Sequence, residues 1–366
     1  MTQLDDTTDA GLLRDLLAEM VDRDASDLHL VADYRPIYRI HGVLTPARDE
    51  RLTPEQTAAM VDQVLPDGLR ERFESTHDCD FSTTLAHAGR SMRFRVNAFA
   101  NQRRRGACFR RVADEIPSLD WLGFPHDLAE RIIFSPHGLI LFTGITGSGK
   151  TTSMASLINL LNTQGGYRII TIEEPIEYVF PKTAGSVVSQ REVGIDVPTF
   201  YDGLKFGLRQ DPDVILVGEI RDHATAEMAL AAAETGHLVF STLHTRDAKG
   251  AVTRFVDLFP RDTQDDVRGQ LSLSLRYVVA QHLLPSAVPG EKRVLALEVM
   301  STNFAVASAI RLGKIEALET AIQTGRRDGM FTLDDQLAAL FQQNRITAEI
   351  VRRHAKDPDG LVGRRH

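Results

Sequence analysis

The feature that most constrains this chain is the glycine-rich segment 144–151, which reads Gly-Ile-Thr-Gly-Ser-Gly-Lys-Thr. It matches the GxxxxGK[ST] pattern of a phosphate-binding loop at every fixed position. The apolar residues 138–143 precede it and predict a buried strand, and residues 152–161 follow it and predict a helix. The order strand, glycine loop, helix and strand is typical of an α/β fold with a mainly parallel sheet.

The glycines of this loop allow backbone N–H groups to turn inward around phosphates, at the positive end of the helix that follows. We expect Lys150 to neutralise the β- and γ-phosphates of a nucleotide and the Thr151 hydroxyl to bind Mg²⁺. The alternative is a glycine-rich turn with a chance lysine, and the flanking strand and helix argue against it. The residues predicted to hold the nucleotide are Gly144, Thr146, Gly147, Ser148, Gly149, Lys150, Thr151 and Thr152.

Composition argues against several other classes of protein. The 42 Lys and Arg residues against 50 Asp and Glu give a net charge of −8, which disfavours a broad nucleic-acid-binding surface. The two cysteines, Cys79 and Cys108, form no CxxC pair, so we expect no four-cysteine zinc site and a reduced, cytoplasmic setting. The polar N-terminus does not resemble a signal peptide. The apolar runs are far shorter than the roughly 20 residues of a membrane span, so a membrane connection requires a partner.

The length of 366 residues predicts two domains. The first is a small α+β domain, and the second is the α/β domain that carries the glycine loop. Beyond about residue 300 the strand signals fade and apolar residues recur with helical spacing. The expected boundaries are 1–112 for the N-terminal domain, 113–125 for a linker, 126–300 for the α/β core and 301–366 for a helical extension.

The first 112 residues contain recognisable local signals. Apolar spacing predicts a helix at 11–23, and strand-forming residues predict strands at 28–31, 37–40 and 92–99. Another helix is expected to begin after Thr53, because Thr53 can cap it, Pro54 suits its first turn and Gln56 completes a capping box.

The strand predicted at 92–99 alternates arginine with apolar residues. Successive side chains of a strand point to opposite faces, so Arg93 and Arg95 are expected on the same face.

Hydrolysis needs a positioned water in addition to a phosphate cradle. The apolar run 214–217 predicts a strand that ends in Gly218 and Glu219. Gly218 stands where an aspartate usually binds Mg²⁺, so Glu219 must act alone, and we expect it to activate the attacking water. The alternative is a solvated acid at the end of a strand.

Two further pairs of polar residues flank predicted strands. Glu173 and Glu174 follow an apolar strand, at the end where parallel sheets bind ligands. They could place the water, and Glu174 could bind Mg²⁺ through water, while a solvated acidic loop is an equal alternative. His237 and His244 flank a third strand. Each is either a structural histidine or a sensor of the γ-phosphate, and the second role suits His244 better.

Together the glycine loop, the acidic pair, the strand ending in Gly218-Glu219 and the two histidines resemble the secretion and type IV pilus ATPase superfamily. Residues 25–30 and 93–99 also resemble it, so the likeness covers nearly the whole chain. The short length and the missing four-cysteine module distinguish the chain from extension and type II secretion ATPases. The stretches that resemble the retraction ATPases, which are PilT-like and PilU-like, are 189–194, 208–222 and 323–330.

The resemblance implies a PAS-like N-terminal domain, a RecA-like P-loop ATPase domain and a helical C-terminal extension, assembled as a hexamer. It implies ATP and Mg²⁺ as cofactors and a motor that drives type IV pilus retraction, and hence twitching motility, by domain rotation. The implied partners are an inner-membrane platform protein and a paralogous motor ATPase. They would hold the chain at the cytoplasmic side of the inner membrane, without membrane insertion and without nucleic acid.

By the same resemblance, Arg93 and Arg95 complete the nucleotide site, where an arginine stabilises charge on the γ-phosphate. The alternative for both is the solvated face of an edge strand. Two positions depart from the family's pattern. Glu174 replaces the usual aspartate of the acidic box, and the retraction motif is degraded at 306–312.

The degraded motif keeps a second hypothesis open, an accessory subunit that binds ATP and assists another pilus or secretion motor. A third hypothesis is a nucleic-acid translocase on a similar core. The acidic balance and the single Trp121 argue against it, because such channels are basic or rich in aromatic residues.

Overall fold

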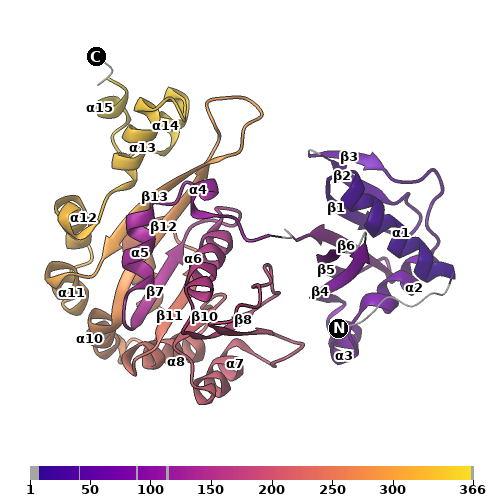
Figure 1. The fold of residues 1–366 in the computed structure, drawn as a ribbon, viewed down its shortest axis with the longest axis horizontal. Helices are drawn as coiled ribbons and strands as arrows, with labels where there is room; N and C mark the ends of the chain where they lie inside the picture. Colours follow the sequence, from indigo (N-terminus) through magenta and orange to yellow (C-terminus); the bar gives the residue numbers. More distant parts are fainter. Residues whose placement is uncertain (1–7, 41, 88–89, 113–114, 364–366) are drawn as a thin grey trace. The chain divides into compact units, whose positions relative to one another are not determined.

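The computed structural model describes residues 8–40, 42–87, 90–112 and 115–363, which form two compact units (Figure 1). Unit 1 comprises the described part of Met1–Glu115 together with Glu173–Val179 and Gln190–Thr199. Unit 2 comprises Ile116–Ile172, Phe180–Ser189 and the described part of Phe200–His366. Two short segments from the middle of the chain therefore belong to the same unit as the N-terminal region.

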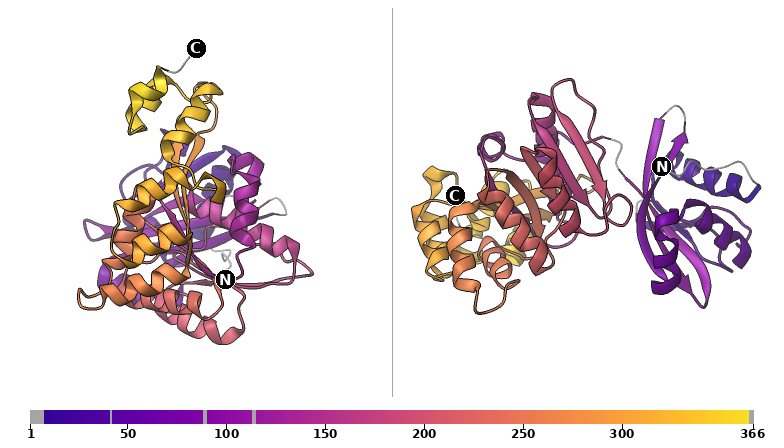
Figure 2. Two further views of the ribbon diagram at one scale, coloured as in Figure 1. Left: turned by 90° about the vertical axis from the view of Figure 1, so that its left-hand side faces the viewer. Right: turned by 90° about the horizontal axis from the view of Figure 1, so that it is seen from below.

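Unit 1 is built on a six-stranded sheet with the order β3-β2-β1-β6-β5-β4, in which every pair is antiparallel. Its strands are β1 (Ala25–Leu30), β2 (Ile37–Ile40), β3 (Val43–Pro46), β4 (Asp78–His87), β5 (Arg90–Asn101) and β6 (Arg104–Arg111). Its helices are α1 (Thr8–Asp22), α2 (Pro54–Val64) and α3 (Asp67–Thr76). Helices α1 and α2 contact each other as well as the strands, so they cover the same face of the sheet (Figure 2).

The strand β5 confirms the alternation predicted for it. Met92, Phe94, Val96 and Ala98 are buried in the core of unit 1, which α1 and α2 complete. Arg93 and the other residues between them face the opposite side and are partly exposed.

Unit 2 contains the predicted parallel sheet, with the order β13-β12-β7-β11-β10-β8-β9. Its strands are β7 (Gly138–Thr143), β8 (Arg168–Glu173), β9 (Val187–Glu192), β10 (Val214–Val217), β11 (Leu238–Leu243), β12 (Leu275–Leu284) and β13 (Val294–Ser301). The pairs from β12 to β8 are parallel, and β13 pairs antiparallel with β12. Every residue of β7, β10 and β11 is buried, as expected for strands covered on both faces. The last residues of β8 and β9 pack with unit 1.

Helices surround this sheet, and α6 and α8 both pack against β7. The helices of the core are α4 (Leu119–Leu122), α5 (His126–Ile133), α6 (Lys150–Gln164), α7 (Phe200–Gly207), α8 (His223–Glu234), α9 (Ala248–Val256) and α10 (Gln264–Ser274). The C-terminal helices are α11 (Phe304–Arg311), α12 (Ala317–Thr324), α13 (Leu333–Gln342), α14 (Ala348–His354) and α15 (Pro358–Val362). Short 3₁₀ turns lie at η1 (Leu208–Gln210) and η2 (Arg326–Asp328). The predicted helical C-terminal region is confirmed, and α12 and α13 contact β13 (Figure 1).

The segment 113–125, which we expected to be a linker, has structure in its described part. Ser118 caps the short helix α4 by accepting a hydrogen bond from Trp121 N at 3.2 Å. Phe124 is 2% exposed, and its ring lies 6.5 Å from that of Phe142 in β7. Phe124 therefore packs within unit 2.

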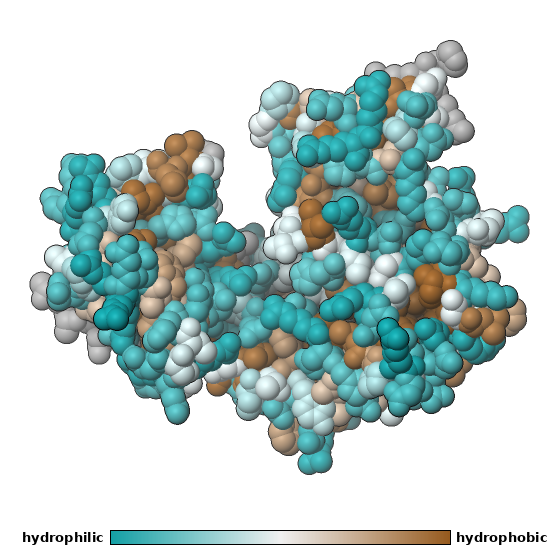
Figure 3. All heavy atoms as spheres, turned by 180° about the vertical axis from the view of Figure 1, so that it is seen from behind, coloured by the Kyte–Doolittle hydropathy of each residue, from teal (hydrophilic) through white to brown (hydrophobic). Residues whose placement is uncertain are grey.

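The surface is mostly hydrophilic on the face shown in Figure 3, where hydrophobic residues form small separate patches. Among the described residues, no helix has both the length and the apolar character needed to cross a membrane.

The capping box predicted at Thr53 is confirmed and generates a test. Thr53 Oγ1 accepts from Gln56 N at 3.2 Å, and Gln56 Oε1 accepts from Thr53 N at 2.9 Å. Replacing Thr53 by alanine removes the acceptor for a helix N–H group, so we expect Thr53→Ala to lower the free energy of unfolding by about 1 kcal/mol. Urea denaturation followed by circular dichroism measures the change. Thr53→Ser keeps the acceptor and should stay close to wild type, and an equal loss in both variants would contradict the capping role.

Candidate functional site

The glycine loop lies between β7 and α6, at the carboxyl end of the central strands. Gly144, Gly147 and Gly149 have φ values of +146°, +78° and +88°. These conformations favour glycine, which bears no Cβ. The backbone therefore requires the glycines that the motif supplies.

Lys150 is the first residue of α6 and is 7% exposed. Its Nζ donates to Gly144 O at 2.7 Å and to Ile145 O at 3.2 Å. The ammonium group therefore lies inside the curve of the loop, where a phosphate would meet it. Thr151 follows in the first turn of the helix.

A residue of strand β12, Gln281, contacts the glycine loop. The sequence did not indicate this contact. Gln281 is 2% exposed, and its Nε2 donates to Ser148 O at 2.7 Å. A Cβ added at Gly144 would lie 2.4 Å from Gln281 O, and one added at Gly149 would lie 2.8 Å from Gln281 Nε2. Gly144 and Gly149 are therefore needed for two reasons: they adopt the backbone conformation of the turn, and they let the loop pack closely on β12. No local sequence signal marks Gln281, because its role depends on the neighbouring strand.

The structure brings Glu219 and His244 together. Glu219 follows β10, and His244 follows β11, the next strand of the sheet. His244 Nε2 lies 3.3 Å from Glu219 Oε2, and Arg221 forms an ion pair with the other oxygen. The Glu219 side chain is 13% exposed and that of His244 is 53% exposed. The pair therefore places a carboxylate and an imidazole at the carboxyl ends of the strands, the same edge of the sheet as the glycine loop.

His237 lies at the other end of β11. Its backbone oxygen accepts from Gly138 N, at the start of β7, and its Nδ1 lies 2.9 Å from Ala232 O. The six residues of β7 separate that edge from the glycine loop by about 20 Å at the usual rise of a strand. The structure does not bring His237 to the loop, because parallel neighbours place their equivalent ends together.

Glu173 is the last residue of β8 and is 6% exposed. Its Oε1 accepts from Gln190 Nε2 at 3.2 Å, and its backbone oxygen accepts from Val193 N at 2.9 Å. Glu174 follows it and is joined to Pro175 by a cis peptide bond. Both acids belong to unit 1.

The arginines of β5 are held by acids within unit 1. Arg93 Nη2 donates to Glu192 Oε2 at 2.8 Å, and the Glu192 side chain is 3% exposed. Ser82 donates to the same carboxylate from its N at 3.0 Å and from its Oγ at 2.7 Å. Arg95 lies 3.7 Å from both Asp80 and Glu177. The solvated face considered for Arg93 is therefore wrong, since a buried carboxylate binds its guanidinium.

Taken together, the fold and the site define a P-loop ATPase. The chain belongs to the family described as type II/IV secretion system protein, whose sequence profile matches residues 2–357. It is 40% identical to the "Type IV pilus retractation ATPase PilT" of Pseudomonas aeruginosa over 349 residues, which cover 95% of this chain and 99% of that protein. It is 38% identical to the "Type IV pilus ATPase PilU" of the same organism over 346 residues, covering 94% and 89% of the two chains.

A crystal structure of the pilus retraction motor PilT with bound ADP has the same fold. It superposes with a TM-score of 0.85 at 41% identity, and the match covers 96% of this chain and 98% of that one. The two-domain architecture with a helical C-terminal region is therefore the architecture of the pilus and secretion ATPases.

Gln281 offers a test of the support beneath the loop. Gln281→Ala leaves the Ser148 carbonyl without its side-chain donor, and we expect ATP to bind about fivefold more weakly, since a net hydrogen bond is worth about 1 kcal/mol. Fluorescence titration with a labelled nucleotide measures the affinity. Gln342→Ala removes an exposed glutamine from α13 and is the matched control. Wild-type affinity in Gln281→Ala would show that the loop does not need this support.

Glu192 offers a second test, because its carboxylate is the shared acceptor for Arg93 and Ser82. Glu192→Ala leaves a partly buried guanidinium without its anion, so we expect the free energy of unfolding to fall by about 3–5 kcal/mol. Glu177→Ala removes the more exposed partner of Arg95 and should cost less than about 1 kcal/mol. Urea denaturation of both variants compares the two losses. Equal losses of stability in the two variants would contradict the role of Glu192 as the buried acceptor for Arg93 and Ser82.

Proposed function

We propose that this chain is an ATP-hydrolysing motor that drives type IV pilus retraction as a hexamer. The observation that carries the proposal is the Glu219–His244 pair, whose side chains lie 3.3 Å apart just after β10 and β11. Strand β11 is the neighbour of β7, which leads into the glycine loop, and β10 is the next strand beyond it. A phosphate cradle alone binds nucleotide, whereas a carboxylate beyond it can orient the attacking water. The likeness to retraction ATPases over nearly the full length of both chains supports the pilus as the machine.

Each site residue has a proposed role. Lys150 binds the β- and γ-phosphates, and the backbone of 144–149 donates N–H groups to them. Glu219 orients the water and accepts its proton, while His244 holds Glu219 and senses the γ-phosphate. Glu173 helps to place the water.

Magnesium fits the groups available, because the Thr151 hydroxyl and the Glu174 carboxylate are the hard oxygen ligands that it prefers. The ion, when bound, neutralises charge on the phosphates. Gly218 supplies no carboxylate, so Thr151 would be the residue that binds the ion directly, and Glu174 would bind it through water.

Arg93 and Arg95 are proposed to contact the γ-phosphate of a neighbouring subunit of the ring. In this structure Glu192 binds Arg93, so that role requires Arg93 to exchange Glu192 for phosphate. Such an exchange would couple nucleotide state to the position of unit 1. The further proposed partners are an inner-membrane platform protein, which would hold the ring at the membrane, and a paralogous motor ATPase.

A second candidate is an accessory ATP-binding subunit that assists another motor. The observation that favours it is the degraded motif at 306–312. Residues 306–311 of this segment lie in α11, where Val306 and Ile310 are buried and serve the fold.

Steady-state ATP hydrolysis by the purified chain with Mg²⁺ distinguishes the two candidates. We expect Glu219→Gln to reduce turnover at least 100-fold while ATP still binds, because it removes the group that orients the water. Lys150→Ala should weaken both binding and turnover, because it removes the charge that meets the phosphates. If the wild-type ring binds ATP but turns over no faster than Glu219→Gln, the motor is excluded and the accessory subunit is supported.

A further inference from the structure

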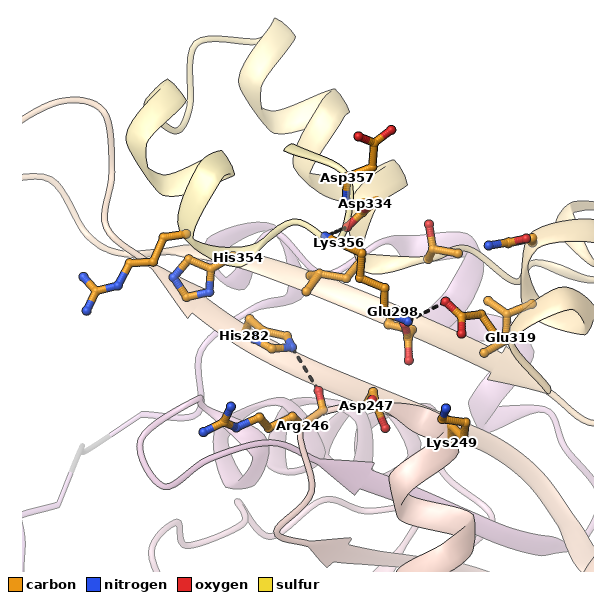
Figure 4. A pocket seen from close by; sticks show the side chains of 15 residues that line it. Arg246, Asp247, Lys249, His282, Glu298, Glu319, Asp334, His354, Lys356 and Asp357 are labelled. Atoms are coloured by element: carbon orange, nitrogen blue, oxygen red, sulfur yellow. Dashed lines mark hydrogen bonds and ion pairs between the residues drawn. The ribbon is translucent and has the colours of Figure 1, made fainter. Parts of the chain in front are cut away.

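A cavity of about 400 Å³ lies in unit 2, between strands β12 and β13 and the C-terminal helices (Figure 4). His282 of β12 and Glu298 of β13 line it from the sheet, and Glu319 of α12 and His354 of α14 line it from the helices. This volume is within the range of pockets that bind small molecules. None of the roles proposed above uses it.

The two ends of the cavity differ in charge. Figure 4 shows Arg246, His282 and His354 at one end and Glu298 and Glu319 at the other. Arg353 precedes His354 on α14 and also lines the cavity. Nitrogen-bearing side chains therefore gather at the first end.

The positive charges of that end lack acidic partners. Within the described ranges, no carboxylate lies within 4.0 Å of the guanidinium of Arg246 or Arg353, whereas Lys249 and Lys356 pair with Glu316 and Glu319 at 2.8 and 2.7 Å. The two arginines therefore contribute about two positive charges to the lining of the cavity, and neither charge is balanced by an ion pair among the described residues.

The histidines add hydrogen-bond donors to this end. Their ring centroids lie 6.4 Å apart, and His282 Nε2 donates to Arg246 O at 3.1 Å. Burial lowers the pKa of both His282 and His354, so near pH 7 they are neutral. The attraction for an anion therefore comes from Arg246 and Arg353.

Two simpler explanations do not account for this cluster. Nowhere in the described part of the chain do three or more His, Cys, Asp or Glu side chains meet in a way that could hold a metal ion. Cations in the last turn of α14 offset the helix dipole, which explains Arg353 and His354. It does not explain Arg246, which lies between β11 and α9, or His282, which lies in β12.

The cavity and the glycine loop are both in contact with strand β12. Gln281 donates to Ser148 O in that loop, and His282, the next residue of β12, lines the cavity. Successive residues of a strand point to opposite faces, so one strand contacts both sites. Arg246 likewise follows His244 by two residues.

We propose that the basic end of this cavity binds the phosphate group of a small anion. Guanidinium groups bind phosphate through paired hydrogen bonds. Two unpaired charges match the charge of about −1.5 to −2 on a phosphate monoester near pH 7, which a carboxylate does not reach. Either free phosphate or a phosphate monoester carries this chemistry. A ligand there would contact the strand that supports the glycine loop.

Calorimetric titration of the full-length chain tests the proposal. Saturating ADP occupies the glycine loop, and inorganic phosphate and ribose 5-phosphate are then titrated separately. We expect Arg246→Ala and Arg353→Ala each to weaken binding of these probes about tenfold or more, because each removes a charge-assisted pair of hydrogen bonds. Tighter binding of ribose 5-phosphate would identify a monoester as the ligand, and tighter binding of inorganic phosphate would identify the free ion.

Arg352→Ala is the matched control, because Arg352 neighbours Arg353 on α14 and does not line the cavity. It should bind both probes like wild type. Thermal unfolding of each variant establishes that it is folded. The proposal is overturned if the ADP-bound wild type binds neither probe, if both cavity variants keep wild-type affinity, or if Arg352→Ala loses as much. Binding is measured without turnover, so failure here leaves the proposed motor function untouched.

Discussion

The junction between the ends of β7 and β11 is the interaction on which the site depends. The Thr143 hydroxyl, at the end of β7, accepts from Thr245 N at 2.9 Å and donates to Thr245 O at 2.8 Å. Thr143 is fully buried, so these bonds are shielded from water and hold the two strand ends together. The glycine loop begins one residue after Thr143, and His244 lies one residue before Thr245. A single buried hydroxyl therefore fixes the phosphate cradle against the strand end that carries the imidazole.

Strand β12, the other neighbour of β7, also contacts the glycine loop. Gln281 meets the glycine loop from β12, and the close approach of its backbone to Gly144 leaves no room for a side chain there. On the opposite face of the same strand, His282 meets the C-terminal helices. The helical extension is therefore in contact with the strand that shapes the nucleotide loop. A change in how the C-terminal helices pack on β12 could shift Gln281 and, through it, the glycine loop. In unit 1, the buried Glu192 plays a comparable organising role for Arg93.

Much of the fold could be predicted from local patterns because their causes are local. The alternation in β5, the capping box at Thr53 and the apolar run of β7 each depend on a few neighbouring residues, and each has its predicted form in the structure. The segment 113–125 was predicted to be a linker, and in the structure its residue Phe124 packs on Phe142. Nothing local to that segment indicates a partner in β7.

The sequence alone determined the chemistry of the loop, since glycines at fixed spacing, a lysine and a threonine are sufficient to specify a phosphate cradle between a strand and a helix. It also identified Glu219 and His244 as groups at strand ends. Only the tertiary structure decided that these two meet, that His237 lies at the far edge of the sheet, and that Arg93 is bound by Glu192. The reason is physical. A strand's identity follows from its own residues, whereas its neighbours and its register follow from the packing of the whole sheet.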